Sequence, residues 1–525
     1  MRKDIAMKQT FFALAFLAMT SAGAATDWEQ MNTAAREQAK MPIRAGVPGF
    51  RPFWNGYAKA FIHPPAFAFR EIDGARAYRF VLTAKQNSEN TPLPVTHVWT
   101  AAKPWFPVPA DLWDSLKPGS YTLRVTGTGA QETSVAGERT FHRAAVFQGP
   151  YPKGVCDYRT AARRVYAAVY KLPQVQGWKT NDDPPQGYDL YCYPAKIISA
   201  MIYALVRHAQ AVEKTAANER EDALALACKM ADWLIAHSQP AGAPLAHFPP
   251  TYWGNRRHVA VKNAGQNMLL YPARAALAYL ELDRMVKKNV YTKAALSIAG
   301  TYAKLQSADG TWPLMVREKD GTPVRANRLG PDYSLFELFT ELSSHDASFT
   351  NTYNRAFSYI LKGPLKNWNW DGQFEDMEPM PPYQNLQKGV AAEMAKRLFT
   401  LGRLSEGCEL VAWCEDQFVV WSDPIHHMDW KNWKTPTALE QYDYYTPIDA
   451  SMGDMIGAFA AASVATGNRL YLEKAKALAD NITRHQHADG TIPTYFDSRK
   501  GSDWVNCMVF VADQLEKLAN ILDRR

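Results

Sequence analysis

The spacing of hydrophobic residues along the chain changes near residue 150. Before that point, the segments FAFREI, AYRFVLTA, THVWTA and SYTLRVTGTG alternate apolar and polar residues. The turn-forming stretches DGA, SENTP and KPG separate them, as is typical of short antiparallel strands. The pattern predicts an antiparallel β-sandwich over residues 48–150, preceded by a lead segment at 26–47. No residue in it suggests catalysis, so we expect a structural or orienting module.

From about residue 155 onward, apolar residues recur at helical spacing. Many of the helical segments are rich in alanine, which lets neighbouring helices approach closely, and they tend to come in pairs separated by turns with Gly and Pro. The clearest are IISAMIYALVRHAQAV, DALALACKMADWLIAHS, ARAALAYLELDRMV, KAALSIAGTYAKLQ, GVAAEMAKRLFTLG, SMGDMIGAFAAASVATG and YLEKAKALADNITRHQ.

One phrase is repeated in this helical part. LQSADGTWPL at 305–314 returns as HQHADGTIPT at 485–494, each after a helix that begins with Tyr. Asp309 and Asp489 are 180 positions apart, which is three units of about 60. A weaker copy places Gln239 67 positions before Gln306, and a degraded one places Asp371 62 positions after Asp309. A period near 60 corresponds to two helices and two loops.

About six such hairpins fit the helical part, and six hairpins closed in a ring make an (α/α)6 toroid over residues 151–525. Its inner helices would line a funnel. In the repeated phrase, Gly supplies a positive φ and the Asp side chain caps nearby N–H groups. We therefore predict that Asp309 and Asp489 serve the architecture of the fold.

The N-terminus has the pattern of a cleavable signal peptide over residues 1–25. Arg2, Lys3 and Lys8 precede the apolar run FFALAFLAM and the small-residue stretch SAGAA. The run is about half the length of a membrane span. Export to the periplasm or the cell exterior is expected, with no membrane span. The net charge of +7 is mild for 525 residues and does not imply a nucleic-acid partner.

Aromatic residues make up 12% of the chain, and many Trp and Tyr residues fall in loop-like segments. Exposed aromatic rings stack on sugar rings, although most are simply packed. The six cysteines have neither a CxxC nor a metal-ligand spacing, so structural cysteine is predicted and any disulfide is left unassigned. No GxGxxG or P-loop is present, so we expect no nucleotide cofactor; Ca²⁺ is left open.

The repeated turns, paired Ala-rich helices, export signal and Trp-rich loops resemble those of bacterial six-hairpin glycosidases. This group includes the unsaturated glucuronyl hydrolases, and several toroidal polysaccharide lyases share the scaffold. The resemblance covers residues 155–525 and includes no complete catalytic motif. It implies glycan cleavage as a class. Residues 48–150 similarly resemble a fibronectin-III-type module of the kind attached to glycan-degrading enzymes.

The densest acidic loop is NWNWDGQFEDMEP at 367–379. Glycoside hydrolysis needs a carboxylic acid and a second carboxylate, and aromatic walls raise the pKa of an acid. Glu375 and Asp376 are therefore candidate catalytic residues, with Trp370 and Asp371 as substrate contacts. A solvated acidic turn is the alternative interpretation.

A second cluster, ALEQYDYYTPIDAS at 438–451, precedes an Ala-rich helix. Glu440, beside tyrosines, is the candidate second carboxylate, and Tyr442 a substrate contact. Asp449 fits a residue that caps the helix start. Upstream, Trp430 is a further candidate contact, while the adjacent His426 and His427 do not predict a metal site.

Three further segments supply candidate substrate contacts. Arginine forks grip carboxylates in a bidentate way, which points to an acidic sugar such as a uronate; surface pairing with acids is the alternative. The residues are Asp189 and Tyr191 from 187–194, Trp253, Asn255, Arg256, Arg257 and His258 from 247–263, and Arg328, Asp332 and Tyr333 from 324–334.

Three functions are compatible with these patterns. The favoured hypothesis is a glycoside hydrolase with paired carboxylates, acting on an acidic oligo- or polysaccharide. A polysaccharide lyase would instead neutralise a uronate with Arg256 or Asn255 and remove a proton with His258 or Tyr333. A glycan-binding protein without catalysis is the third.

Overall fold

The computed structural model describes residues 27–44, 53–85, 95–129, 133–324, 328–329, 333–367, 388–422, 432–442, 445–499 and 503–525. The predicted signal peptide at 1–25 lies outside them. Within these ranges, none of the helices combines the length and apolar character that a membrane span needs.

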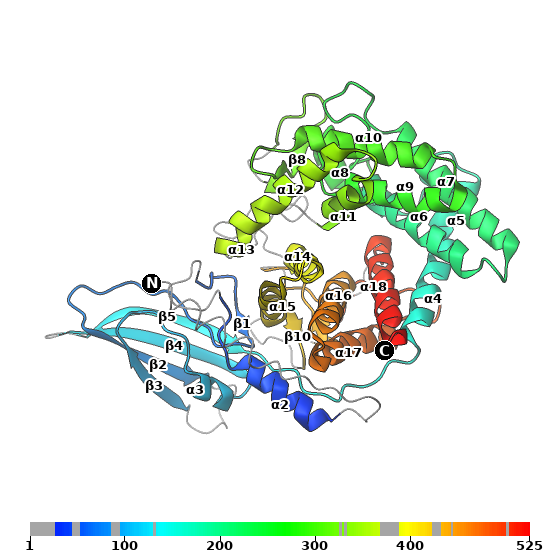
Figure 1. Ribbon diagram of the computed structural model, residues 1–525. Helices are drawn as coiled ribbons and strands as arrows, with labels where there is room; N and C mark the ends of the chain where they lie inside the picture. Colours follow the sequence, from blue (N-terminus) through cyan, green and yellow to red (C-terminus); the bar gives the residue numbers. More distant parts are fainter. Residues whose placement is uncertain are drawn as a thin grey trace.

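Residues 158–523 form two concentric rings of helices (Figure 1). Six inner helices close a ring in which each packs against the next and α18 meets both α16 and α6. They are α6 (Pro194–Ala211), α9 (Tyr271–Val286), α11 (Tyr333–Leu342), α14 (Lys388–Thr400), α16 (Asp449–Thr466) and α18 (Val505–Asp523).

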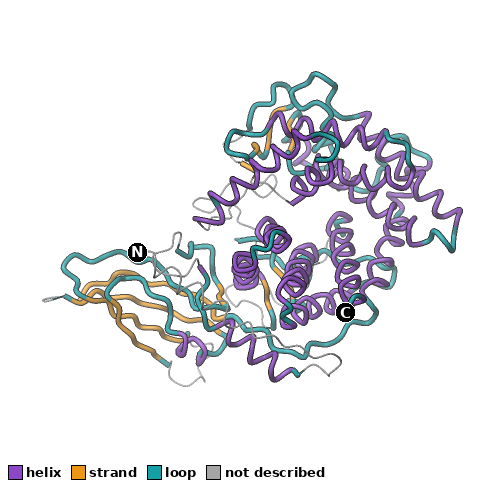
Figure 2. Tube along the Cα trace, viewed as in Figure 1, coloured by secondary structure: helices purple, strands orange, loops and turns teal. Residues whose placement is uncertain are grey.

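An outer helix precedes each inner helix along the chain and packs on the ring. The outer helices are α4 (Tyr158–Lys171), α7 (Ala217–Ala236), α10 (Val290–Leu305), α12 (Ala347–Lys362), α15 (Leu404–Phe418) and α17 (Arg469–His485). The predicted (α/α)6 toroid is therefore confirmed by the packing of the chain itself, and all seven segments predicted as helical lie in these helices. Figure 2 shows the same closed arrangement of helices.

Short and long connections alternate around the ring. An inner helix reaches its outer partner through a short turn, such as 287–289 or 467–468. An outer helix leads to the next inner helix through a long connection, such as 237–270 or 486–504. Short elements occur in the long connections: α5 (Pro173–Gln176), η2 (Gly177–Lys179), η3 (Asp189–Cys192), α8 (His258–Lys262), α13 (Pro364–Asn367) and the two-stranded pairs β6 (Gln266–Met268) with β8 (Met315–Arg317), β7 (Trp312–Pro313) with β9 (Arg328–Leu329), and β10 (Val419–Val420) with β11 (Thr437–Ala438). We call the end of the ring at which the inner helices begin the mouth.

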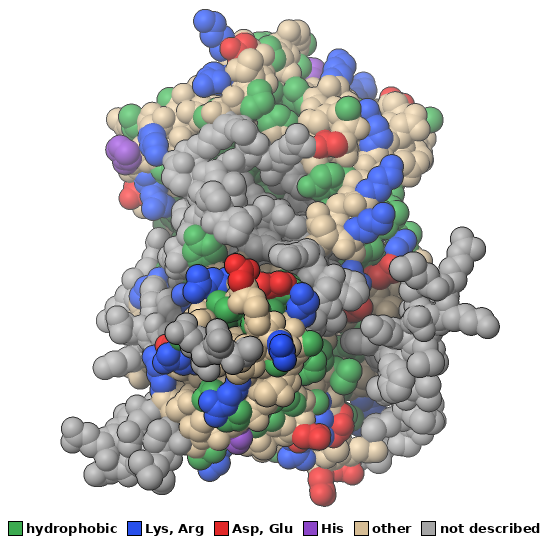
Figure 3. All heavy atoms as spheres, turned by 90° about the vertical axis from the view of Figure 1, so that its left-hand side faces the viewer, with side chains coloured by type: hydrophobic (Ala, Val, Ile, Leu, Met, Phe, Trp, Pro, Cys, Tyr) green, Lys and Arg blue, Asp and Glu red, His purple; other side chains and the backbone are tan. Residues whose placement is uncertain are grey.

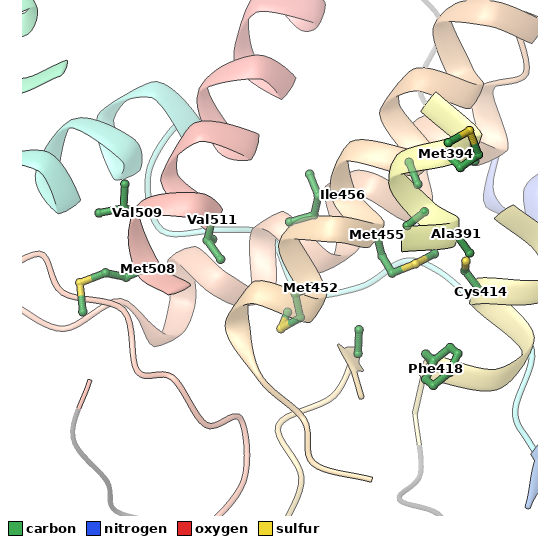
Figure 4. Packing of buried hydrophobic residues seen from close by; sticks show 14 of the residues in the cluster. Ala391, Met394, Cys414, Phe418, Met452, Met455, Ile456, Met508, Val509 and Val511 are labelled. Atoms are coloured by element: carbon green, nitrogen blue, oxygen red, sulfur yellow. The ribbon is translucent and has the colours of Figure 1, made fainter. Parts of the chain in front are cut away.

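The inner helices approach one another closely because small residues lie between them. A Cβ atom added at Gly457 of α16 would lie 2.4 Å from Gln514 Oε1 of α18. Around this contact, Met452 and Ile456 of α16 lie in the buried hydrophobic packing with Val511 of α18 and Met394 of α14 (Figure 4). The Ala-rich composition therefore sets the spacing of the ring.

The repeated phrase fastens outer helices to their neighbours. Gln306, after α10, donates through Nε2 to the Thr352 carbonyl of α12 at 3.0 Å, and Gln486, after α17, donates to the Ala161 carbonyl of α4 at 2.9 Å. Each glutamine also donates to the carbonyl of the glycine in its own turn. Each copy thus ties one outer helix to the next.

The aspartates of the phrase hold the turns themselves. Asp309 Oδ1 accepts hydrogen bonds from the Thr311 N–H and hydroxyl at 3.1 and 2.7 Å, and Asp489 Oδ1 accepts the equivalent pair from Thr491 at 2.9 and 2.7 Å. The glycine that follows each aspartate has a φ of 93° or 95°. The predicted architectural role of both aspartates is confirmed.

The N-terminal part holds one five-stranded sheet in the order β1-β5-β4-β2-β3. Its strands are β1 (Ala60–Phe61), β2 (Ala77–Ala84), β3 (Thr96–Ala101), β4 (Gly119–Thr128) and β5 (Thr133–Arg143); helices α2 (Trp28–Ala39) and α3 (Ala110–Ser115) accompany them. All pairs are antiparallel except β1 with β5. Lys, Arg and acidic side chains are interspersed over the face of the molecule in Figure 3.

The predicted two-sheet sandwich is not confirmed, since the described residues of this part form a single sheet. Alternation does bury one face, through Leu123 and Val125 of β4. Trp113 of α3 and the extended segment around Phe67 cover that face, each contacting Phe141 of β5. The segment contains His-Pro-Pro at 63–65, and prolines lack the N–H that a ladder needs.

Buried polar contacts join the sheet to the ring. Asp416 of α15 is 2% exposed, and its Oδ1 accepts hydrogen bonds from the backbone N–H groups of Ile62 and His63, each at 2.7 Å. Nearby, Lys474 of α17 and Glu415 of α15 form an ion pair at 2.7 Å, with side chains 3% and 5% exposed. Lys474 Nζ also donates to Gln38 Oε1 of α2 at 3.2 Å. The N-terminal part is thus anchored on the outer helices α15 and α17.

Candidate functional site

Thr494 joins two sides of the mouth. It follows the second copy of the repeated phrase, and its Oγ1 accepts a hydrogen bond at 2.8 Å from the Trp504 N–H, just before α18. Its carbonyl accepts a hydrogen bond at 2.9 Å from the Asp449 N–H, at the start of α16. The N–H of Phe496 donates to the Pro447 carbonyl at 2.9 Å and extends the same contact. Asp449 and Trp504 therefore lie on adjoining segments.

Three carboxyl groups, which we call the acid trio, gather beside Thr494: Glu440, Asp449 and Asp503. Asp449 is the first residue of α16 and is completely buried. Its Oδ1 accepts from the Ala450 N–H at 2.7 Å, whereas its Oδ2 is buried without a hydrogen-bond partner. Glu440 is partly exposed, and its N–H donates to the Thr446 carbonyl at 2.8 Å.

The charges of the acid trio oppose one another. Burial raises the pKa of Asp449 well above its ordinary value, and the Asp503 and Glu440 carboxylates raise it further. Burial also raises the pKa of Asp503, with Asp489 adding to the shift and His487 opposing it. Neighbouring carboxylates in a partly desolvated site cannot all ionise. Burial and the neighbouring carboxylates therefore both favour the protonated form of Asp449.

Next to the acid trio, Lys196 lies in a cage of aromatic rings. Lys196 lies in the first turn of α6 and is only 8% exposed. The ammonium Nζ lies 4.5 Å from the ring centroid of Trp504, 5.4 Å from that of Tyr271 and 5.7 Å from that of Tyr193. Cations are attracted to aromatic faces at these distances. The exposed Arg257 guanidinium lies 5.8 Å from the Trp504 ring as well.

The residues at the mouth combine three chemical capacities. The Trp504 indole, which is partly exposed, can pack on the apolar face of a sugar ring. The cations Lys196 and Arg257 can attract an acidic substituent. The acid trio can supply both a protonated and an ionised carboxyl group.

Four of the predicted contacts are exposed residues in the connections that precede α6 and α9. Arg257 is exposed beside Trp504, and Asp189, Asn255 and His258 are also exposed. Among the predicted catalytic residues, Glu440 belongs to the acid trio. These positions are open to a ligand.

Tyr333 begins the inner helix α11 and is half-buried. The Lys396 ammonium of α14 lies 5.0 Å from its ring centroid. Burial, with the nearby Glu337 and Glu393 carboxylates, raises the pKa of Tyr333 to about 12. A tyrosine that serves as the base of an elimination must ionise readily, so this shift has the wrong direction for the lyase scheme.

Arg256 is engaged by the backbone. Its guanidinium donates to the carbonyls of Pro184 at 2.6 Å, Pro185 at 2.9 Å and Tyr188 at 3.2 Å. It holds the segment before η3 in place and has little capacity left for a substrate carboxylate. The two cations that lie near Trp504 are Arg257 and Lys196.

Tyr191 and Trp253 occupy packing positions. Tyr191 is completely buried, accepts a hydrogen bond from Trp178 Nε1 at 2.8 Å and donates to the Gln174 carbonyl at 2.9 Å. Trp253 packs edge-on against Trp233, with ring centroids 5.1 Å apart. These contacts give both residues a structural role, and their predicted contact with a substrate stays a prediction.

Tyr442 is also a packing residue. It is 3% exposed, donates to Gln417 Oε1 at 2.8 Å and stacks on Phe418 at 5.1 Å, towards the interface with the sheet. The predicted site residues Asp332, Trp370, Asp371, Glu375, Asp376 and Trp430 lie outside the described residues, and only the backbone of Arg328, in β9, is described. Their roles stay predictions.

The sequence contained signals for the residues that were missed. Lys196 is the single cation in the otherwise apolar start of the segment PAKIISAM, and Asp503-Trp504 is an acid–aromatic pair directly before a helix. Tyr271 likewise precedes a proline at the start of α9. The shared signal is a polar or aromatic residue at the first turn of each inner helix. No group of His, Cys, Asp and Glu in the described ranges could hold a metal, and no disulfide joins any of the six cysteines, all of which lie in those ranges.

Several solved structures are similar to this chain. They include a family 76 glycoside hydrolase from a bovine Bacteroides thetaiotaomicron strain (TM-score 0.44, 11% identity, 86% of this chain and 94% of that one). A D-mannose isomerase (0.49, 15%, 69% and 97%) and an unsaturated glucuronyl hydrolase specific for heparin (0.42, 9%, 70% and 98%) are also similar. No family model and no curated protein sequence matches the chain. At these scores, the similarities carry no argument about activity, which has to come from the site.

Proposed function

We propose that this protein is an exported glycoside hydrolase that cleaves an acidic, uronate-containing oligo- or polysaccharide at the mouth of the toroid. The observation that carries the proposal is the junction at Thr494, which places the acid trio beside the aromatic cage of Lys196. A sugar ring stacked on Trp504 would have a cation on one side and carboxyl groups on the other.

The acid trio provides the groups that hydrolysis requires. One carboxylic acid gives its proton to the glycosidic oxygen as the bond to the sugar carbon breaks. A second group, ionised, either takes a proton from the attacking water or bonds to the sugar carbon before water releases it. Glu440, which is partly exposed, is proposed as the ionised group. Glu375 and Asp376 remain proposed as carboxyl groups from the loop at 367–379. No cofactor enters this scheme.

The aromatic cage supports an acidic substrate. The Lys196 ammonium lies over the rings of Trp504, Tyr271 and Tyr193, so a cation lies at the mouth. Arg257 lies near the same tryptophan and is exposed. Two cations beside one stacking platform favour a sugar that carries a carboxylate.

A panel of uronate-containing and neutral oligosaccharides tests the proposal. A hydrolase releases reducing ends without a new ultraviolet absorbance, whereas a lyase generates an absorbing unsaturated product. Glu440→Gln should lower kcat by about 10²–10⁴-fold, because proton transfer and nucleophilic roles have effects of that size. Glu71→Gln, on an exposed ion pair of the sheet module, is the matched control and should leave kcat unchanged.

Two results would contradict the proposal. Glu440→Gln and Glu375→Gln could both turn over at the wild-type rate, which would remove the assigned carboxyl pair. Calorimetry could also show tight glycan binding without any product, which would indicate a glycan-binding protein.

A further inference from the structure

Asp449 is an unusual residue for the first turn of a helix. It is completely buried, and its Oδ2 has no hydrogen-bond partner. Buried polar atoms in folded proteins are nearly always paired, so each exception calls for an explanation. Its position at the start of inner helix α16 places it at the mouth, in the acid trio.

Helix capping does not explain it. At the starts of α4 and α12, Asp157 and Asp346 accept a backbone N–H from two or three residues further on, and those hydrogen bonds lower the pKa of both. Both are ordinary ionised helix-start aspartates. In α16 the capping position is Ile448, and Asp449 bonds only to the N–H of the adjacent Ala450. The side chain is thus turned away from the usual capping geometry.

Two of the charged groups that act on Asp449 are carboxylates. Glu440 acts on it from the segment before α16, and Asp503 from the connection before α18. Asp503 in turn faces Asp489 and His487. Among the members of the trio, Asp449 is the most deeply buried, so the neutral form is least costly there.

We propose that Asp449 is a positioning residue that holds the proton of the acid trio and thereby keeps Glu440 ionised for its reaction. The proposal rests on the proposed function, since Glu440 is the reacting group. With Asp449 neutral, Glu440 has one fewer negative neighbour and stays a carboxylate at neutral pH. Its base or nucleophile role needs that form.

Isotope-edited infrared spectroscopy tests the protonation directly and without any substrate. With carboxyl-labelled aspartate at pH 7, the difference spectrum between wild type and Asp449→Asn should contain the carbonyl band of a protonated carboxylic acid. The difference spectrum for Asp346→Asn, the matched control, should contain carboxylate bands instead. Carboxylate bands in the Asp449→Asn spectrum would overturn the proposal, even if no glycan is ever found to be cleaved.

The pH profile of kcat/KM tests the link to Glu440. Asp449→Asn removes no charge under the proposal, so the acidic limb of the profile stays at the wild-type pH. Asp503→Asn, which removes a fraction of a charge, should move that limb to lower pH. A limb that moves to lower pH in Asp449→Asn by as much as in Asp503→Asn would show that Asp449 is ionised, and would overturn the proposal. Equal unfolding midpoints confirm that the variants fold.

Discussion

Asp416 and Asp449 are both buried aspartates, in different parts of the molecule. Asp416, at the interface between sheet and ring, has both oxygens in use: Oδ1 accepts two backbone N–H groups and Oδ2 accepts from Gln417. Asp449, at the mouth, has one oxygen without a partner and two acidic neighbours. At the interface, both carboxyl oxygens of the buried aspartate accept hydrogen bonds. At the mouth, one carboxyl oxygen of the buried aspartate accepts none. A buried polar atom without a hydrogen-bond partner is typical of a residue that is kept for function.

The two buried lysines differ in the same way. Lys474 at the interface is paired with Glu415 at 2.7 Å and lies beside no open surface. Lys196 at the mouth is surrounded by three aromatic rings. The ion pair with Glu415 holds Lys474 within the protein, whereas the Lys196 ammonium lies against the aromatic rings at the starts of α6, α9 and α18.

The largest expected effect on stability comes from breaking the interfacial pair. Lys474→Met leaves Glu415 buried without its cation and should lower the free energy of unfolding by about 3–5 kcal/mol. Lys196→Met should cost clearly less stability but raise KM for uronate substrates. Urea unfolding and initial rates measure both. A greater loss of stability in Lys196→Met than in Lys474→Met would contradict the claim that the lysine at the interface contributes more to stability than the lysine at the mouth.

The next effect is on the pH dependence of stability. Burial raises the pKa of Asp416 to about 7, above its ordinary value near 4, so its contribution to stability is complete below about pH 4 and is lost as pH rises through 7. Wild-type stability should fall by about 2–3 kcal/mol between pH 5 and pH 8 through this group. In Asp416→Asn that part of the slope should vanish. Unfolding midpoints at the two pH values decide, and an unchanged slope would show that Asp416 is ionised throughout.

A smaller effect is expected at the turn that supports the mouth. A Cβ at Gly490 would lie 2.5 Å from the Arg164 carbonyl oxygen, in a backbone conformation with φ of 95°. Gly490→Ala should therefore lower the free energy of unfolding by about 1–3 kcal/mol. Gly467→Ala is the control, because Gly467 also has a positive φ but has open space where the Cβ would lie. It measures the cost of the backbone strain without the steric clash. Equal losses in both would show that the contact with α4 is unimportant.

The smallest effect concerns the two glutamine clamps. Gln306→Ala and Gln486→Ala each remove two hydrogen bonds to backbone carbonyls and should each cost about 1–2 kcal/mol. Thermal unfolding gives the values. Only Gln486 begins the turn that leads to Thr494, so kcat should fall in Gln486→Ala and not in Gln306→Ala. The same kcat in both variants would show that the turn after Gln486 does not support the residues at the mouth.

The ring was predictable because it repeats. A period near 60, helical spacing of apolar residues and two copies of one turn each report on local structure, and each was visible in the sequence. The sandwich was not, since alternation shows which residues of a strand are buried but not what buries them. Here a helix and a proline-containing segment cover the face instead of a second sheet.

The site was predictable only in part, for the same reason. Arg256 and Arg257 are adjacent in the sequence and have similar chemistry, yet one donates to three backbone carbonyls and the other is exposed beside Trp504. The sequence around the two arginines cannot show which of them is held by the backbone, because the groups they contact come from distant segments. The Lys196 cage combines the starts of α6, α9 and α18, and only closure of the ring brings those together.

The most direct measurement for the central claim is a crystal structure of Glu440→Gln with a bound uronate oligosaccharide. The account predicts a sugar ring on the Trp504 indole, its carboxylate next to Lys196 and the scissile bond beside residue 440. A glycan bound on the sheet or on the outer helices, with the mouth vacant, would contradict it.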